Sequence, residues 1–199
     1  LALEGVISKE EALMRVEGEH VEQLLRPAFD PNAEKEAVAR GLNASPGAAV
    51  GMAVFSADRA REMAADGDDV ILVRPETAPD DVPGMLASRG VLTQKGGATS
   101  HAAVVARGNN LPCVAGCGEI TVDTNRRRFT TEDGVVVQEG DIISIDGFTG
   151  EVFVGAMPMI ESRYEDQEDL IKLLTWADEV RVLGVRTNAD YPEDAQRAV

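Results

Sequence analysis

Short apolar runs of the kind found in β-strands recur between residues 41 and 155, each bounded by turn-forming residues. Stretches with helical signals interrupt them. One begins after Ser56, a suitable N-cap, and ends at Gly67, and another carries acidic residues in its first turn and stops at Gly90. Because strands alternate with helices, the pattern predicts an α/β fold for this segment. The strand-like runs are "AAVGMAVFS", "DVILVRP", "GVLTQ", "VVVQEGDIISIDG" and "EVFVG".

The two flanks of this segment differ from it in pattern. Residues 1–40 are acidic and helical in periodicity, and Ser8 with Glu11 fits a capping box. Residues 156–199 contain a second helical stretch, with one apolar stripe formed by Leu170, Leu173, Leu174 and Ala177. We therefore predict three parts: a helical segment at 1–40, a central domain at 41–155, and a connector helix followed by the start of a further domain at 156–199. The last residues stop within a predicted helix without a cap, so we expect the chain to be a fragment of a longer protein.

Charge and composition exclude several classes of partner. The 199 residues carry a formal net charge of -16, so a nucleic acid or an anionic membrane surface would be repelled. No apolar run approaches the roughly 20 residues that span a bilayer, and the start lacks a secretion pattern, so we predict a cytoplasmic protein. Cys113 and Cys117 are too few for a disulfide scaffold and have no nearby histidine for a zinc site, so we interpret them as structural thiols.

The most informative local motif is "GGATSHAAVVAR" at residues 96–107, which places one of the chain's two histidines after a glycine pair. We expect a helix there that ends with Gly108 at its C′ position, so that His101 lies in the first turn. Backbone N–H groups in a first turn lack intrahelical partners and lie at the positive end of the helix dipole. The motif therefore predicts a site for an anion, with phosphate as the natural candidate.

Each residue of the motif suits that chemistry. Gly96 and Gly97 allow close approach of the backbone, while Thr99 and Ser100 offer hydroxyls for capping or for phosphate oxygens. The imidazole of His101, with an ordinary pKa of roughly 6.5, is largely neutral at cellular pH and has one nitrogen lone pair for nucleophilic attack. The alternative is a histidine that only makes a structural hydrogen bond. A serine-hydrolase pair with Ser100 fails, since consecutive helical side chains point about 100° apart.

These residues also carry a resemblance to a known family. "GGATSHAAVVARGNNLPCVAGC" resembles the phosphohistidine signature of the phosphoenolpyruvate-utilising enzymes, and "GLNASPGAAVG" is similar to the usual opening of that domain. "LVRPETAPDDVPGM", "GDIISIDGFTGEVFVG" and "VRTNADYPEDAQRAV" look like the dikinase branch of the family. Ala98 departs from the methionine of the dikinases and from the arginine of phosphoenolpyruvate synthase and sugar-system enzyme I.

The resemblance implies a swivelling β/β/α phosphohistidine domain that carries phosphate between two remote sites. It makes His101 the nucleophile and carrier, and Gly97, Thr99 and Ser100 positions that cradle the phosphate. Arg107 would neutralise charge or, equally, make a surface contact. Thr99 matches the threonine that a regulatory protein phosphorylates in plant dikinases. Flexible connections are expected at "RPAFDPNAE" and "GAMPMIESR".

The same resemblance implies partners in the same polypeptide. An ATP-grasp nucleotide-binding domain would precede this piece and a (β/α)8 pyruvate-binding barrel would follow, its first strand being "LGVRTN". The full-length enzyme, expected to be a homo-oligomer, would interconvert ATP, phosphate and pyruvate with AMP, pyrophosphate and phosphoenolpyruvate. Mg²⁺ would bind those other domains, with no metal held by this fragment. Two alternatives stay open: the equivalent domain of the synthase or of enzyme I, and a non-catalytic docking module.

Overall fold

The protein is described by a computed structural model that consists of two compact units. The larger, which we call the central unit, spans residues 22–162, and the smaller combines residues 1–21 with residues 163–199. The residues that the structure describes are 2, 6–18, 21, 26–33, 36–160 and 167–184. His20 and the residues predicted to begin a (β/α)8 barrel, from 185 onward, lie outside them.

An eight-stranded sheet forms the framework of the central unit, with the strand order β2-β12-β11-β4-β5-β6-β7-β3. Strands β4 to β7 run parallel to one another, and every other neighbouring pair is antiparallel. The edge strands β2 and β3 are separated by one residue in the chain, so the sheet curls until its two edges meet. The strands are β2 (Ala39–Arg40), β3 (Leu42–Ser45), β4 (Ala48–Val54), β5 (Val70–Arg74), β6 (Gly90–Thr93), β7 (Cys113–Ala115), β11 (Ile142–Asp146) and β12 (Glu151–Val154).

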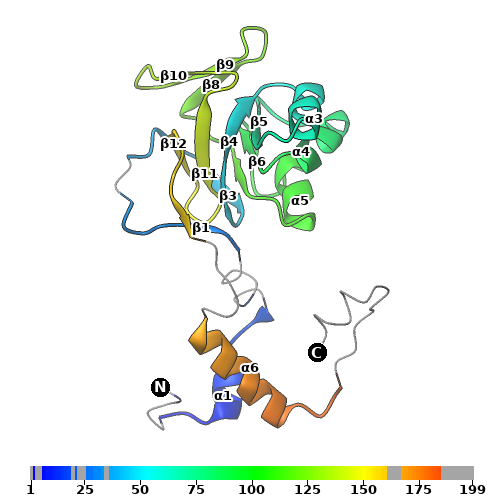
Figure 1. Cartoon of the computed structure of the whole chain (residues 1–199), viewed down its shortest axis with the longest axis vertical. Helices are drawn as coiled ribbons and strands as arrows, with labels where there is room; N and C mark the ends of the chain where they lie inside the picture. The colour runs from blue at the N-terminus through cyan, green and yellow to red at the C-terminus, as the bar shows by residue number, and fades with distance from the viewer. Residues whose placement is uncertain are drawn as a thin grey trace. The chain divides into compact units, whose positions relative to one another are not determined.

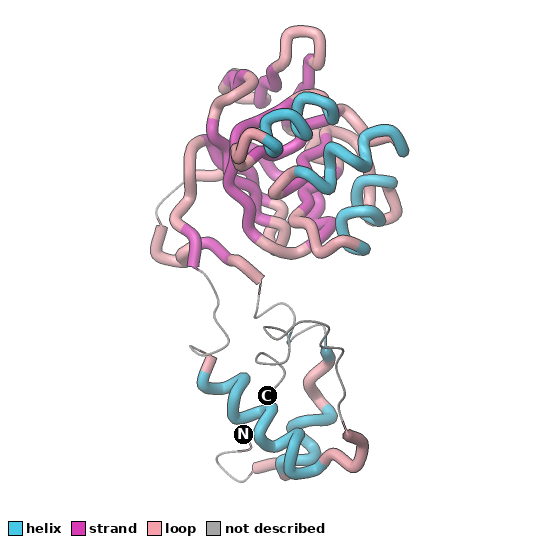
Figure 2. The backbone as a smooth tube through the Cα atoms, turned by 45° about the vertical axis from the view of Figure 1, so that its right-hand side comes forward, coloured by secondary structure: helices cyan, strands magenta, loops and turns pink. Residues whose placement is uncertain are grey.

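Three helices lie together on one side of this sheet (Figure 1 and Figure 2). They are α3 (Ala57–Ala65), α4 (Val82–Ala87), which follows the short 3-10 turn Pro79–Asp81, and α5 (His101–Gly108). Each connects one parallel strand to the next, as the α/β pattern predicts, so the α/β fold is confirmed. Ser56 is the N-cap of α3 and accepts the N–H of Arg59 at 3.2 Å, as expected from its position.

The parallel strands are buried on both faces, and this gives two apolar cores. Ile71 and Val73 of β5 pack into the core enclosed by the curled sheet, with Phe55 and Phe129. Their neighbours in the same strand point the other way, toward the helices, because successive side chains of a strand alternate between faces. The core on the helix side contains Val70, Leu72, Met85, Ala102, Ala103 and Ala106.

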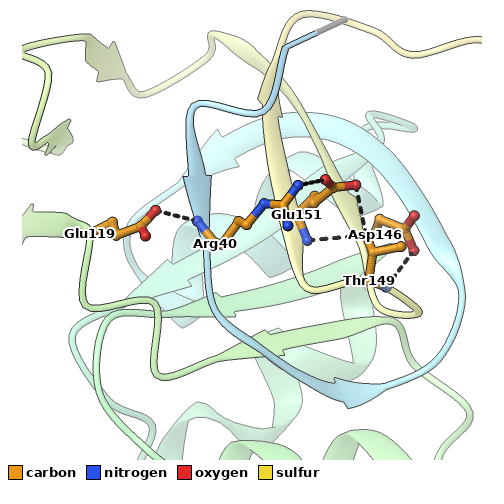
Figure 3. A network of polar contacts seen from close by, with 5 residues as sticks. All are labelled: Arg40, Glu119, Asp146, Thr149 and Glu151. Atoms are coloured by element: carbon orange, nitrogen blue, oxygen red, sulfur yellow. Dashed lines mark hydrogen bonds and ion pairs between the residues drawn. The ribbon is translucent and has the colours of Figure 1, made fainter.

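A second sheet of three antiparallel strands extends from the central unit, in the order β10-β9-β8. A polar network lies beside it, at the seam where β2 turns into β3 (Figure 3). The backbone N–H of Arg40 donates to Glu119 at 2.7 Å, and its guanidinium pairs with Glu151, which also accepts from Thr149 at 2.9 Å. The network ties β2 to β12 and to the loop before β8. The three strands are β8 (Ile120–Asp123), β9 (Arg128–Thr131) and β10 (Val136–Gln138).

The two segments expected to be flexible connections are bonded to each other and to the central unit. Strand β1 (Ala28–Phe29) pairs antiparallel with β13 (Met159–Ile160). In addition, Ala48 N–H donates to Pro27 at 2.9 Å, and Arg26 donates to the carbonyl of Pro46 at 2.7 Å. These contacts restrain the described parts of both segments, and the flexible connections remain predictions. The predicted domain boundaries at 41 and 155 remain predictions.

The smaller unit contains two described helices, α1 (Lys9–Met14) and α6 (Glu168–Val180). Ser8 caps α1 by accepting the N–H of Glu11 at 3.1 Å, which is one half of the predicted capping box. Lys9 pairs with Glu179 at 2.7 Å and lies 5.8 Å from the ring centroid of Trp176. Because these groups are exposed, the pair adds little stability. The sequence pattern predicted residues 1–40 to be helical, but their described part contains the strands β1 and β2 as well as the helix α1.

Candidate functional site

His101 is the first residue of α5, as the sequence pattern predicts. Ser100 is the N-cap, and its hydroxyl accepts the N–H of Ala103 at 3.4 Å. The side chain of His101 is half-buried, while Ala102 and Ala103 behind it are fully packed in the core. The imidazole is therefore fixed at the positive end of the helix, where the partial charge of the first turn favours an anion.

The site lies at the carboxyl edge of the parallel strands. Strands β5 and β6 end at Arg74 and Thr93, and the segments that follow them run side by side, with the N–H of Lys95 donating to Pro75 at 2.8 Å. The segment after β7 joins them, since the N–H of Cys117 donates to the carbonyl of Thr93 at 2.9 Å. In open α/β sheets this edge is where ligands bind.

Thr77, in the turn after β5, contacts the imidazole. Its Oγ1 lies 3.1 Å from Nδ1 of His101, although the two residues are 24 positions apart in the sequence. The contact occupies Nδ1 and leaves Nε2 as the second nitrogen of the ring. When Nδ1 carries the proton and donates it to Thr77, the lone pair is on Nε2.

The glycine loop before α5 is held by an unusually close backbone contact. Gly116 has a φ of +61°, and a Cβ built on it would lie 2.2 Å from the carbonyl oxygen of Gly96. Gly96 itself has a φ of +126°, which strongly favours glycine. By contrast, no described atom lies within 4 Å of a Cβ at Gly97, so the loop has open space on that side. Ala98 and Thr99 are exposed.

Arg107 returns from the second turn of α5 to the glycine loop. Its Nη2 donates to the carbonyl of Ala98, and its Nε donates to the carbonyl of Ala103 at 3.1 Å. The side chain therefore spans almost two turns of the helix and reaches the loop. Both of these contacts are with backbone carbonyls, so Arg107 fastens the loop to the helix and brings a positive charge beside it.

The end of α5 differs from the prediction. Gly108 is the last helical residue, not the residue beyond the helix, and Asn109 is the C-cap. The left-handed residue is Asn110, with a φ of +53°. Asparagine tolerates that conformation better than most residues, so the helix gains two positions before the chain turns.

The two cysteines lie at opposite ends of the short strand β7: Cys113 begins it, and Cys117 follows it on the side of the site. Cys113 and Cys117 are fully buried, and burial raises the pKa of each thiol to about 12. At neutral pH they are neutral thiols that pack as small apolar groups, and a neutral thiol is a poor nucleophile. The interpretation as structural thiols agrees with this environment.

The sequence motif did not reveal Thr77, or Arg74 and Asp81 that flank it. The signal was present in "RPETAPDD", which directly follows a buried strand. Because neighbouring parallel strands end at the same edge of a sheet, polar residues after β5 are expected to meet those after β6. Using that signal requires knowing that β5 and β6 are neighbours, which local patterns do not state.

The described residues contain no group of three or more His, Cys, Asp or Glu side chains placed to hold a metal ion. Among the described helices, none is both long and apolar enough to cross a membrane.

Comparison with known proteins agrees with the geometry. Residues 66–150 match the family described as the mobile domain of PEP-utilising enzymes. The chain belongs to the phosphoenolpyruvate-utilising enzymes and contains their mobile domain. Within that family its relatives are pyruvate, phosphate dikinases, which it matches along its whole length. The resemblance inferred from the sequence is thereby confirmed.

Three relatives illustrate the match. The chain is 48% identical over 198 residues to the enzyme of Rhizobium meliloti (strain 1021), covering 100% of the chain and 22% of that protein. It is 47% identical to that of Clostridium symbiosum (98% and 22%) and 50% identical to the chloroplastic enzyme of Mesembryanthemum crystallinum (100% and 21%). The chain thus spans about a fifth of their length. A solution structure of Enzyme I covers 55% of the chain at 27% identity, with a TM-score of 0.33.

Proposed function

We propose that this chain is the phosphoryl-carrier domain of a pyruvate, phosphate dikinase, with His101 as the residue that is phosphorylated. One observation carries the proposal. The imidazole stands in the first turn of an eight-residue helix with Nδ1 3.1 Å from Thr77 Oγ1, so Nε2 is the nitrogen left to react. A site at a helix N-terminus suits the oxygens of the phosphoryl group that the ring would carry.

The transfer step uses the neutral ring. With its proton on Nδ1 and donated to Thr77, the imidazole attacks phosphorus through the Nε2 lone pair. A P–N bond forms while the P–O bond of the donor breaks, and that electron pair leaves with the donor oxygen. The product ring holds a positive charge until the Nδ1 proton is lost. Delivery to an acceptor oxygen is the reverse process, in which the P–N electron pair returns to Nε2.

The residues around the ring would hold the phosphoryl oxygens. Gly97 offers backbone without a side chain in the way. Thr99 offers its N–H and hydroxyl groups at the start of the helix, and Ser100, whose N–H donates to Gly97 at 2.9 Å, offers its hydroxyl. Arg107 contributes positive charge where three oxygens become concentrated, and its bond to Ala98 keeps the loop in place. Such preorganised donors stabilise the charge that develops during transfer.

The remaining chemistry belongs to other parts of a longer polypeptide in this proposal. An ATP-grasp domain would supply the phosphoryl group from ATP, and a (β/α)8 domain would present pyruvate, with phosphate as the further substrate. Mg²⁺ supplies charge neutralisation for nucleotide phosphates, and it would be held by those domains. We also propose a swivelling movement of the central unit between them, a homo-oligomeric full-length enzyme and a cytoplasmic location, although the relative from Mesembryanthemum crystallinum is chloroplastic.

The test is a label on His101 in the full-length protein. Phosphoenolpyruvate carrying ³²P is expected to leave an acid-labile, base-stable label, which is the behaviour of a phosphoramidate. His101→Asn should keep the fold and lose the label. An acid-stable label, or undiminished labelling of the variant, would contradict the proposal. A protein that binds its partner domains yet takes no label would instead be a docking module.

A further inference from the structure

We propose that Asp81 is a positioning residue for His101: its buried carboxylate holds the turn that carries Thr77 against the imidazole. The inference depends on the proposed function only where it concerns the rate of phosphoryl transfer to His101. The contacts alone support the geometric claim that Asp81 positions Thr77 beside the imidazole. A hydroxyl can accept from Nδ1–H or donate to a bare Nδ1, and the proposal takes the first arrangement, with the proton on Nδ1.

The contacts form a continuous path from Asp81 to the ring. Asp81 is only 6% exposed, and its Oδ2 accepts the backbone N–H of Ala78 at 2.9 Å. Ala78 directly follows Thr77, whose Oγ1 lies 3.1 Å from Nδ1 of His101. The carboxylate therefore fixes the peptide next to the threonine, at the point where a small shift of the turn would move the hydroxyl away from the ring.

The other oxygen of Asp81 anchors the turn to the sheet. Oδ1 lies 3.4 Å from Nε of Arg74, the last residue of β5, and Nη1 of Arg74 donates to the carbonyl of Phe55 at 2.9 Å. The Nε atom is buried and has no hydrogen-bond partner among the described residues, so the Asp81 carboxylate is the opposite charge that it faces. A buried ion pair that loses one partner leaves an uncompensated charge, and the structure around it moves to relieve that charge.

The two ends of the turn are thereby joined. Asp81 ends the 3-10 turn Pro79–Asp81 and starts α4, while Arg74 ends β5, so the pair closes the loop that contains Thr77. Without the carboxylate, the Ala78 N–H loses its acceptor and the Arg74 guanidinium loses its opposite charge. The turn is then free to move, and Thr77 no longer holds the proton on Nδ1. An imidazole in water favours the tautomer protonated on Nε2, which has no lone pair on the reacting nitrogen.

The experiment measures the tautomer directly. The chain is labelled with ¹⁵N-histidine, and long-range ¹H–¹⁵N spectra report which nitrogen of His101 carries the proton; His101→Asn assigns its signals apart from those of His20. We expect Nδ1–H in the wild type and a shift toward Nε2–H in Asp81→Ala. A smaller shift is expected in Asp81→Asn, whose amide oxygen can still accept the Ala78 N–H but whose neutral side chain leaves the Arg74 charge unpaired. Thr77→Val removes the hydroxyl that contacts Nδ1 and therefore gives the full tautomer shift that loss of this contact can cause. Asp80→Ala, which removes an exposed carboxylate one position away, is the matched control and should leave the spectrum unchanged.

A second readout is the rate at which phosphoramidate, a small phosphoryl donor, modifies His101 in the same proteins. Loss of the positioning contact should slow it by about 3- to 10-fold in the Asp81 variants, with no change in Asp80→Ala. Asp81→Asn keeps the side-chain shape and replaces Asp81→Ala if that variant does not fold. Folding is verified from the backbone amide signals of residues remote from the site.

The outcomes separate the two proposals. Unchanged tautomer and rate in a folded Asp81 variant, or an equal effect from Asp80→Ala, would overturn the positioning role. If the tautomer shifts in the Asp81 variants but the wild-type chain takes up no phosphoryl group, the proposed function is overturned and the positioning role stays intact.

Discussion

Thr99→Glu is expected to slow phosphorylation of His101 sharply. Thr99 is exposed and lies two residues before the histidine, on the loop proposed to cradle the phosphate. A unit negative charge about 5 Å from the arriving phosphoryl group raises the activation free energy by about 1 kcal/mol at the dielectric constant of water and by about 3 kcal/mol at a protein-like value. The rate should therefore fall roughly 5- to 150-fold. A phosphate on Thr99 carries nearly twice that charge and should act more strongly. The measurement is the rate of modification of the chain by phosphoramidate.

Two controls separate charge from shape. Thr99→Gln has the shape of the glutamate without its charge and should retain more of the rate than Thr99→Glu, as should Thr99→Ser and Thr99→Val. The loss in Thr99→Glu should also shrink as salt is added, because the screening length is about 10 Å at 0.1 M and about 3 Å at 1 M. A fully active Thr99→Glu, or a loss of equal size in Thr99→Gln, would contradict the electrostatic explanation.

Gly116→Ala is expected to damage both stability and the site. Its Cβ would lie 2.2 Å from the carbonyl oxygen of Gly96, a backbone atom, so the glycine loop must move. The φ of +61° adds left-handed strain. Overpacking and strain together should cost about 2–4 kcal/mol in the free energy of unfolding, measured with urea. In the molecules that remain folded, the displaced loop should lower the rate of modification of His101.

Two other glycines provide matched controls. Gly134 has a φ of +85° with open space around it, so Gly134→Ala reports the strain without the clash. Gly118 has neither a left-handed φ nor a neighbour within 4 Å, and Gly118→Ala should be close to neutral. If Gly116→Ala lost no more stability than Gly134→Ala, the close contact with Gly96 would not be holding the loop.

Local signals predicted the α/β pattern of residues 41–155 but not the strands β1 and β2, which lie in the segment predicted to be helical. The N-cap at Ser56, the buried run that became β5 and the helix start at His101 all depend on neighbours within a few residues. Such features follow from capping, periodicity and glycine placement, which a single sequence displays. The phosphohistidine motif was recognised for the same reason, because its residues are contiguous.

The rest of the candidate site depends on contacts across the sheet. Thr77 meets His101 only because β5 lies beside β6, and Asp81 matters only because it turns back to Arg74 and Ala78. Neither relation leaves a trace in the local pattern. Spacing along the helix left two roles open for Arg107, because it does not show that the long side chain reaches back to Ala98.

The central claim, that Nε2 of His101 receives the phosphoryl group, has one direct test. The ¹⁵N-histidine-labelled chain is modified with phosphoramidate, and the coupling between ³¹P and ¹⁵N identifies the nitrogen that is bonded to phosphorus. The account predicts coupling to Nε2 of His101, because Nδ1 is occupied by Thr77. Coupling to Nδ1 of His101, or phosphorus found only on His20 or on a residue other than histidine, would contradict it.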